Sequence, residues 1–232
     1  MNDLHSFFLR RRNTRTMHKW HHYFEVYERH FARFRHANPT VLEIGVKDGG
    51  SLEMWRAYFG DGAPIHGIDL DPAAMRNEDV ATKIHIGDQA DRAFLREVRR
   101  DAGPFDIVID DGGHTANQQI TTFEELYPAL GETGIYLIED THTALWGGAF
   151  NDRPDGQTIL TFAAERCAQL MEWSGRRENF RQLMSDQHGL LTDRASEFCR
   201  TTKAISFYDS IIVFERGHRT APRHEKRQAI VR

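Results

Sequence analysis

The sequence has few cysteines, no long apolar run and no strong excess of charge. Cys167 and Cys199 are the only two cysteines in 232 residues, too few for a disulfide framework and typical of a reducing compartment. No stretch approaches the length of apolar sequence that a membrane-spanning helix needs. At the amino terminus the charges follow the apolar residues, the reverse of a secretory signal. These absences predict a cytoplasmic protein that does not act at a membrane.

The formal net charge of −4 gives no general electrostatic case for binding nucleic acid. Basic residues nevertheless gather at both ends of the chain: Arg10, Arg11, Arg12, Arg15 and Lys19 at the front, and Arg216, Arg219, Arg223, Lys226 and Arg227 at the tail. We expect these ends to be solvated, and contact with an anionic partner is the alternative.

Between the ends, short runs rich in Ile, Val and Leu alternate with helical patterns. This alternation is typical of βαβ units around a parallel sheet whose strands are buried on both faces. The predicted strands are 40–44, 65–68, 83–86, 106–109 and 135–138, and the predicted helices are 51–58, 91–99 and 116–127. Residues 204–207 and 211–214 predict an antiparallel hairpin that closes the sheet edge.

Two segments flank this pattern. Residues 17–34 predict a helix with many aromatic side chains, either packed on the sheet or acting as a lid over a ligand. Residues 151–203 are expected to be helical, without an assigned chemistry. The chain therefore divides into a helical segment over 1–39, one domain over 40–216 and a basic, flexible tail over 217–232.

A glycine-rich turn links the first predicted strand to the first helix, with the sequence Val-Leu-Glu-Ile-Gly-Val-Lys-Asp-Gly-Gly-Ser over 41–51. Gly45 and Gly49 let the backbone turn tightly and approach a ligand, and Ser51 is expected to cap the helix. The spacing is not G-x-G-x-x-G, and the carboxylate of Glu43 disfavours a pyrophosphate ligand. An ordinary strand-to-helix turn is the alternative.

Acidic residues end the next two predicted strands. Asp69 lies about twenty residues beyond the turn, where a carboxylate can accept both hydroxyls of a ribose. Asp88 and Gln89 follow the third strand, where their oxygens could contact the amino group of adenine. Turn formation at strand ends is the alternative. A nucleoside with a cationic amino-acid arm fits this acidic rim better than a dinucleotide.

The order of Glu43-x-Gly45, Asp69 and Asp88 resembles the class I S-adenosylmethionine-dependent methyltransferases. The resemblance implies an α/β fold with a doubly wound, mostly parallel seven-stranded sheet and a C-terminal antiparallel hairpin. It also implies that Gly45 passes under the methionine portion, Asp69 holds the ribose, and Asp88 with Gln89 contacts the adenine. Tyr23, on the possible lid, is a further candidate contact.

Three carboxylates and a histidine follow the fourth and fifth strands. Asp111 ends the fourth, and Glu139 and Asp140 end the fifth, so they converge if these strands are neighbours. Such carboxylates repel one another unless a cation neutralises them, and oxygen ligands suit Mg²⁺ better than Mn²⁺ or Ca²⁺. His114 is then placed to take the proton of a metal-bound alcohol. A turn, a strand end and a surface or capping histidine are the respective alternatives.

This combination resembles the metal-dependent O-methyltransferases of antibiotic biosynthesis, a branch that includes macrolide sugar O-methyltransferases and cephalosporin hydroxylase-like proteins. The matching segments are 19–31, 42–46, 110–114 and 138–146, and residues 207–210 resemble its closing hairpin. The resemblance implies Mg²⁺ on Asp111, Glu139 and Asp140, His114 as the base, and a homo-oligomer. Gly113 and Gln118 depart from the residues common in that branch, which leaves the acceptor and the subunit contacts open.

We therefore predict a Mg²⁺-dependent transfer of the S-adenosylmethionine methyl group to a hydroxyl of a sugar or glycosylated metabolite. One alternative is a non-catalytic scaffold or sensor that binds S-adenosylmethionine and metal. Methyl transfer to none of a broad panel of hydroxylated compounds, despite cofactor binding, would favour it. The other is an NAD-dependent oxidoreductase, which the glycine spacing disfavours. NAD binding without binding of S-adenosylhomocysteine (SAH) would favour that alternative.

Overall fold

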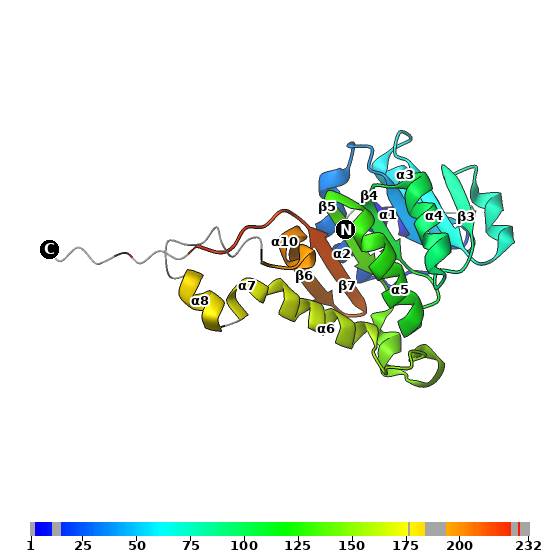
Figure 1. The fold of residues 1–232 in the computed structure, drawn as a ribbon. Coiled ribbons are helices and arrows are strands. Elements are labelled where there is room, and N and C mark those ends of the chain that lie inside the picture. Colours follow the sequence, from blue (N-terminus) through cyan, green and yellow to red (C-terminus); the bar gives the residue numbers. More distant parts are fainter. Residues whose placement is uncertain (1–2, 11–14, 176, 184–193, 224–226, 228–232) are drawn as a thin grey trace.

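The computed structural model describes residues 3–10, 15–175, 177–183, 194–223 and 227. Seven strands form one sheet in the order β3-β2-β1-β4-β5-β7-β6 (Figure 1). Their bounds are β1 Val41–Ile44, β2 Ile65–Asp69, β3 Lys83–Ile86, β4 Phe105–Asp110, β5 Leu130–Ile138, β6 Thr202–Tyr208 and β7 Ile211–Arg216. Strands β1 to β5 are parallel, and β7 is antiparallel to both β5 and β6. The predicted sheet and its closing hairpin are confirmed.

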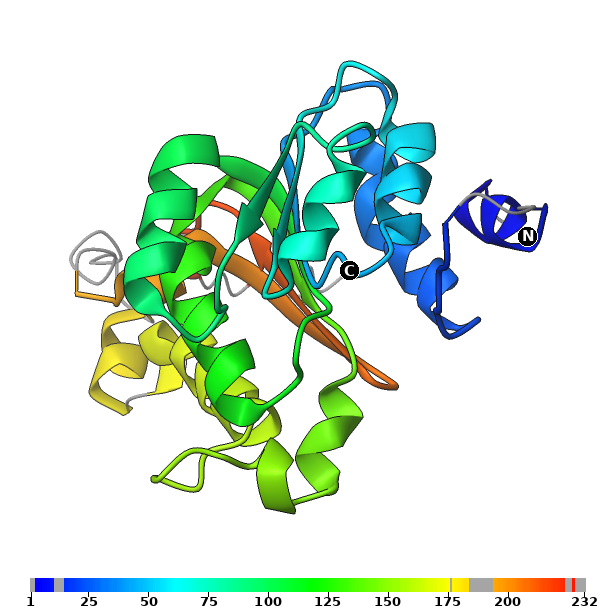
Figure 2. The same cartoon turned by 90° about the vertical axis from the view of Figure 1, so that its right-hand side faces the viewer.

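Helices cover both faces of the sheet (Figure 2). On one face lie α2 (Tyr23–Phe31) and α3 (Gly50–Phe59), with α1 (Asp3–Arg10) against them; on the other lie α4 (Arg92–Ala102), α5 (Ala116–Leu126) and α6 (Ile159–Leu170). Side chains alternate along each strand, so Val41 joins the first core and Leu42 the second. This double burial explains why the strands read as continuous apolar runs.

Shorter helices connect these elements. They are η1 Ala32–Phe34, η2 Pro72–Asn77, η3 Tyr127–Ala129, η4 Thr141–Leu145, η5 Gly148–Phe150, α7 Glu172–Gly175, α8 Arg177–Leu183 and α10 Glu197–Thr201. The helical prediction for 151–203 is confirmed for 159–170, 172–175, 177–183 and 197–201. Residues 151–158, 171 and 194–196 are not helical, 202–203 begin β6, and 176 and 184–193 lie outside the described residues. Of the predicted tail, 217–223 contain no helix or strand, and 224–226 and 228–232 lie outside the described residues.

Two local predictions at the amino-terminal side of the fold are wrong. Residues 17–22 are not helical, and α2 begins only at Tyr23 because the segment before it turns side chains into a cavity. Ser51 does not cap α3: the cap is Gly49, whose positive φ of 77° suits glycine, and the helix starts one residue before Ser51. The Ser51 hydroxyl instead donates to Glu43 Oε2 at 2.8 Å.

The expectation of solvated basic ends is wrong for four residues. Arg15 pairs with Glu53 at 2.8 Å and with Asp79 at 2.6 Å, and Lys19 is buried. At the other end, the guanidinium groups of Arg216 and Arg219 donate to backbone carbonyl oxygens. Arg11, Arg12 and Lys226 lie outside the described residues. Within the described part of the chain, no helix has the length and apolar character to span a membrane.

Two buried histidines on β2 and β3 predict an acid-sensitive fold. The rings of His66 and His85 stack with centroids 5.7 Å apart, and burial lowers the pKa of both, that of His85 to about 4. The unfolded chain then binds protons that the folded chain does not, so stability is present above the unfolded pKa of about 6.5 and is lost as the pH falls toward 4. We expect the titration of these two rings to lower the free energy of unfolding by about 2 kcal/mol over this window, a contribution that the difference between wild type and a variant without the ring isolates.

Urea denaturation between pH 7 and about 4.5 measures this drop. The variant His85→Gln should flatten the pH dependence, because the amide does not titrate. The exposed His36 offers a control, His36→Asn, which should leave the dependence unchanged. An equal pH dependence in His85→Gln and wild type would contradict the assignment.

Candidate active site

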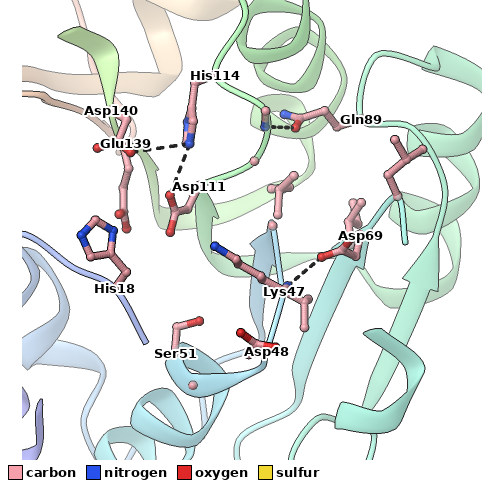
Figure 3. Close-up of a pocket in the computed structure, with 18 of the residues that line it drawn as sticks. His18, Lys47, Asp48, Ser51, Asp69, Gln89, Asp111, His114, Glu139 and Asp140 are labelled. Carbon is pink, nitrogen blue, oxygen red and sulfur yellow. Dashed lines mark hydrogen bonds and ion pairs between the residues drawn. The ribbon is translucent and has the colours of Figure 1, made fainter. Parts of the chain in front are cut away.

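A cavity of about 400 Å³ lies beyond the carboxyl ends of β1 to β5. The strand order reverses between β1 and β4, and ligands of open α/β sheets bind at such reversals. Ten of the residues predicted from the sequence line it: Tyr23, Gly45, Ser51, Asp69, Asp88, Gln89, Asp111, His114, Glu139 and Asp140. Figure 3 shows most of them converging from separate loops.

Two predicted residues, Glu43 and Gly49, do not line the cavity but support the residues that do. Glu43 is fully buried in β1, where it accepts the Ser51 hydrogen bond and burial raises its pKa to about 7. Gly49 packs against Asn77, since a Cβ there would lie 2.4 Å from the Asn77 Oδ1 atom.

The turns after β1 and β4 touch through glycine. Gly45 has a φ of 89°, and a Cβ on it would lie 2.0 Å from the Asp111 carbonyl oxygen. A Cβ on Gly112 would similarly lie 1.9 Å from Gln89 Oε1. Gly45 has no room for a side chain, so it brings the turn that carries Asp111 against the glycine-rich turn, whereas Gly112 lets the Gln89 side chain approach that turn.

Gln89 holds the turn that carries His114. Its Nε2 donates to Asp110 Oδ1 at 3.1 Å, and its Oε1 accepts from the Gly113 amide at 2.8 Å. The sequence predicted a contact from Gln89 to adenine, but these bonds already engage both ends of its amide.

The two acids at the ends of β2 and β3 are fixed by local backbone. Asp69 accepts from the Lys47 amide at 2.7 Å and from the Asp71 amide at 2.9 Å. The exposed Asp88 accepts from the Ala90 amide at 2.8 Å. Both carboxylates are held at the cavity and keep lone pairs for further bonds.

At the opposite end of the cavity, Asp111, His114 and Asp140 surround a small gap. One ligand atom from each lies within 4.8 Å of the others, the only such cluster in the described ranges. His114 Nε2 is 3.8 Å from Asp111 Oδ1 and 3.5 Å from Asp140 Oδ2, and Figure 3 shows the imidazole pointing between them. The two carboxylates offer oxygen ligands that suit a divalent cation, and the imidazole lies beside them.

Lys19 is a site residue that the sequence analysis missed. Its ammonium lies 2.5 Å from Asp111 Oδ2 and 2.8 Å from Glu139 Oε2, and its side chain is only 2% exposed. Burial alone lowers the pKa of Lys19, but the charges of the two carboxylates outweigh burial and raise it above its ordinary value. Lys19 therefore places a permanent positive charge between two of the three predicted metal ligands.

Helix α2 adds two phenols to this cluster. Tyr23 donates to Asp140 Oδ1 at 2.5 Å, and Tyr27 donates to Glu139 Oε1 at 2.6 Å. Glu139 is 1% exposed, and its carboxylate is directed to Lys19 and Tyr27 rather than to His114. Burial raises the pKa of Glu139, and nearby Asp111 raises it further. The aromatic helix thus orients the acids as well as packing on the sheet.

Backbone strain gathers at this cavity. Lys47, His114 and Asp140 line it with φ values of 49°, 59° and 51°, in the left-handed region that favours glycine. Such conformations persist where the surrounding structure enforces them, and they cluster at functional sites. Nothing in the sequence indicated these positive φ values, because none of the three residues is a glycine.

Comparisons with known proteins show which domain the central part of the chain resembles. A family model described as a methyltransferase domain matches residues 42–141. Residues 42–141 are therefore similar to a methyltransferase domain, in agreement with the resemblance inferred from the motif order. The match spans β1 to β5, which together form most of the cavity.

Two curated relatives show which methyltransferases the chain resembles. Over 153 residues the chain is 46% identical to 8-demethyl-8-(2-methoxy-α-L-rhamnosyl)-tetracenomycin-C 3′-O-methyltransferase of Streptomyces olivaceus, covering 61% of this chain and 38% of that protein. It is 39% identical over 153 residues to demethylmacrocin O-methyltransferase of Streptomyces fradiae, covering 62% and 38%. The chain thus spans about two fifths of the length of these curated relatives.

A solved structure shares the fold. MycE methyltransferase from the mycinamycin biosynthetic pathway, in complex with Mg, SAH and mycinamycin VI, superposes with a TM-score of 0.67 at 30% identity. The match covers 87% of this chain and 51% of MycE. The fold of this chain is therefore that of an α/β methyltransferase.

Proposed function

We propose that this chain is a Mg²⁺-dependent O-methyltransferase that moves the methyl group of S-adenosylmethionine to a sugar hydroxyl of a glycosylated polyketide. The observation that carries the proposal is the position of the His114 imidazole between Asp111 and Asp140, in the same cavity that Gly45 and Asp69 line. The names of the relatives and the ligands of the MycE structure support it.

The residues at one end of the cavity suit the methyl donor. Asp69 would accept the ribose hydroxyls, Asp88 would face the adenine, and the bare backbone at Gly45 would allow the methionine portion to approach. S-Adenosylmethionine supplies an electrophilic methyl group when bound. Gln89 acts here as a positioning residue, since its amide holds the turn before His114.

The acid cluster at the other end fits a metal. Asp111 and Asp140 offer the hard oxygen ligands that Mg²⁺ prefers. The third predicted ligand, Glu139, instead bonds to Lys19 and Tyr27 and would have to turn from them to reach the ion. Mg²⁺ held by these residues would supply the positive charge that makes a nearby hydroxyl easier to deprotonate. His114 Nε2, 3.8 Å from Asp111 Oδ1 and 3.5 Å from Asp140 Oδ2, would take the hydroxyl proton.

Residues 16–20 line the cavity from the amino-terminal side. The contacts of Lys19 with Asp111 and Glu139 tether this segment over the site. We propose that the segment acts as the lid expected for residues 1–39 and keeps water away from the reacting hydroxyl.

Metal removal tests the proposed reaction. The chain is incubated with S-adenosylmethionine and 8-demethyl-8-α-L-rhamnosyl tetracenomycin C, and methyl transfer is followed by mass spectrometry. We expect transfer that stops after dialysis against EDTA and returns with Mg²⁺, and that Asp111→Asn lowers by at least about tenfold. Asp101→Asn, on an exposed acid of α4, is the matched control.

Each other outcome assigns a different function. Transfer that is unaffected by EDTA would contradict the metal. SAH binding without transfer to any of a panel of glycosides would favour a scaffold or sensor. NAD binding without SAH binding would favour an oxidoreductase.

A further inference from the structure

Exposed apolar side chains continue outward from the cavity, beginning at Trp20, which lines it. Trp20 and Trp146 are 51% and 63% exposed, whereas Trp55 and Trp173 are buried. Leu145, next to Trp146, is 77% exposed. Exposed apolar side chains that gather in one place commonly mark a binding surface.

These side chains belong to a continuous row of rings. Trp20 contacts His142 edge-on with ring centroids 6.2 Å apart, and His142 contacts Trp146 at 5.1 Å. Trp146 in turn contacts Phe150 at 5.1 Å. The aromatic row, Trp20-His142-Trp146-Phe150, joins the segment before α2 to η4 and η5.

One end of the aromatic row lies at the acid cluster. Trp20 lines the cavity and directly follows Lys19, which contacts Asp111 and Glu139. The Thr143 hydroxyl in η4 donates to the His114 carbonyl oxygen at 3.0 Å. The row is therefore fixed to the backbone of the proposed base.

We propose that the aromatic row binds the apolar polyketide part of the acceptor while the sugar enters the cavity. This inference rests on the proposed function, because that function brings a glycoside hydroxyl to His114. The cavity must also hold the methyl donor, so the polyketide has to lie outside, where the row begins. The aromatic row and Leu145 together present aromatic rings and an alkyl side chain. None of these five side chains carries a carboxylate, an ammonium or a guanidinium group, so they suit uncharged fused or macrocyclic rings.

Equilibrium binding tests the aromatic row without turnover. Two probes are titrated into the chain saturated with SAH: 8-demethyl-8-α-L-rhamnosyl tetracenomycin C, and methyl α-L-rhamnoside, which lacks the polyketide. Trp146→Ala should weaken binding of the first probe by about tenfold and leave the second unchanged. Trp146→Phe should restore most of the affinity, because it keeps a ring.

The matched control is Met171→Ala, at a side chain 57% exposed beyond the end of α6, which should change neither affinity. Unchanged SAH affinity in all variants shows that they are folded. The inference is overturned if Trp146→Ala binds the polyketide glycoside as tightly as wild type, if it weakens both probes equally, or if wild type does not bind the polyketide glycoside.

A second copy of this chain is the other possible occupant. Light scattering of wild type and Trp146→Ala tests it: loss of a dimer without loss of glycoside affinity would make the row a subunit contact and overturn the inference. Glycoside binding that depends on Trp146 without any methyl transfer would instead refute the proposed function and leave this inference standing.

Discussion

Replacing Lys19 with methionine is expected to lower the free energy of unfolding by about 3 kcal/mol in the presence of EDTA. The ammonium is buried between Asp111 and Glu139, and its removal leaves the buried Glu139 carboxylate without its cation. Methionine keeps a similar length and apolar character, so the loss reports the charge rather than packing. Urea denaturation followed by circular dichroism measures it.

A second lysine provides the control. Lys83 pairs with Asp101 at 2.6 Å, but both side chains are about half exposed, and Lys83→Met should cost less than about 1 kcal/mol. Glu139→Gln in the Lys19→Met background should recover part of the loss, because it removes the unpaired charge. Equal losses for Lys19→Met and Lys83→Met would contradict the role given to Lys19.

Replacing His114 with alanine is expected to lower kcat by about 10²- to 10⁴-fold and to leave SAH affinity within about twofold of wild type. The imidazole faces Asp111 and Asp140, at the end of the cavity away from Asp69. Its loss therefore removes proton transfer without removing a contact to the donor. Single-turnover kinetics and titration calorimetry separate these two effects.

His18 is the rival base, because it also lines the cavity and is exposed. His18→Ala should keep kcat within a few-fold of wild type. A loss of turnover in His18→Ala with little change in His114→Ala would transfer the role of base to His18. Parallel losses of turnover and SAH affinity in His114→Ala would show a structural role instead.

The parts of the fold that the sequence predicted are those that depend on local pattern. Strands buried on both faces show as short runs of branched apolar residues, and β1, β2, β3 and β4 appear within one or two residues of their predicted places. The carboxyl ends of parallel strands lie at one edge of the sheet. The sequence therefore predicted that the acids after the neighbouring strands β4 and β5 lie close together.

The missed features depend on contacts between distant segments. Lys19 lies in a basic stretch that resembles a solvated end, and only its contact with acids about a hundred residues away makes it a buried cation. The same contact draws residues 17–20 out of the helix that their aromatic pattern predicted. The cap prediction for Ser51 is wrong because Gly49, two residues earlier, can take the positive φ at the cap.

The most direct test of the account is a crystal structure of the chain with SAH and Mg²⁺. The account predicts the homocysteine portion beside Gly45, the ribose on Asp69, and the ion contacting Asp111 and Asp140 next to His114. An ion bound elsewhere, or SAH outside the cavity that Gly45 and Asp69 line, would contradict it.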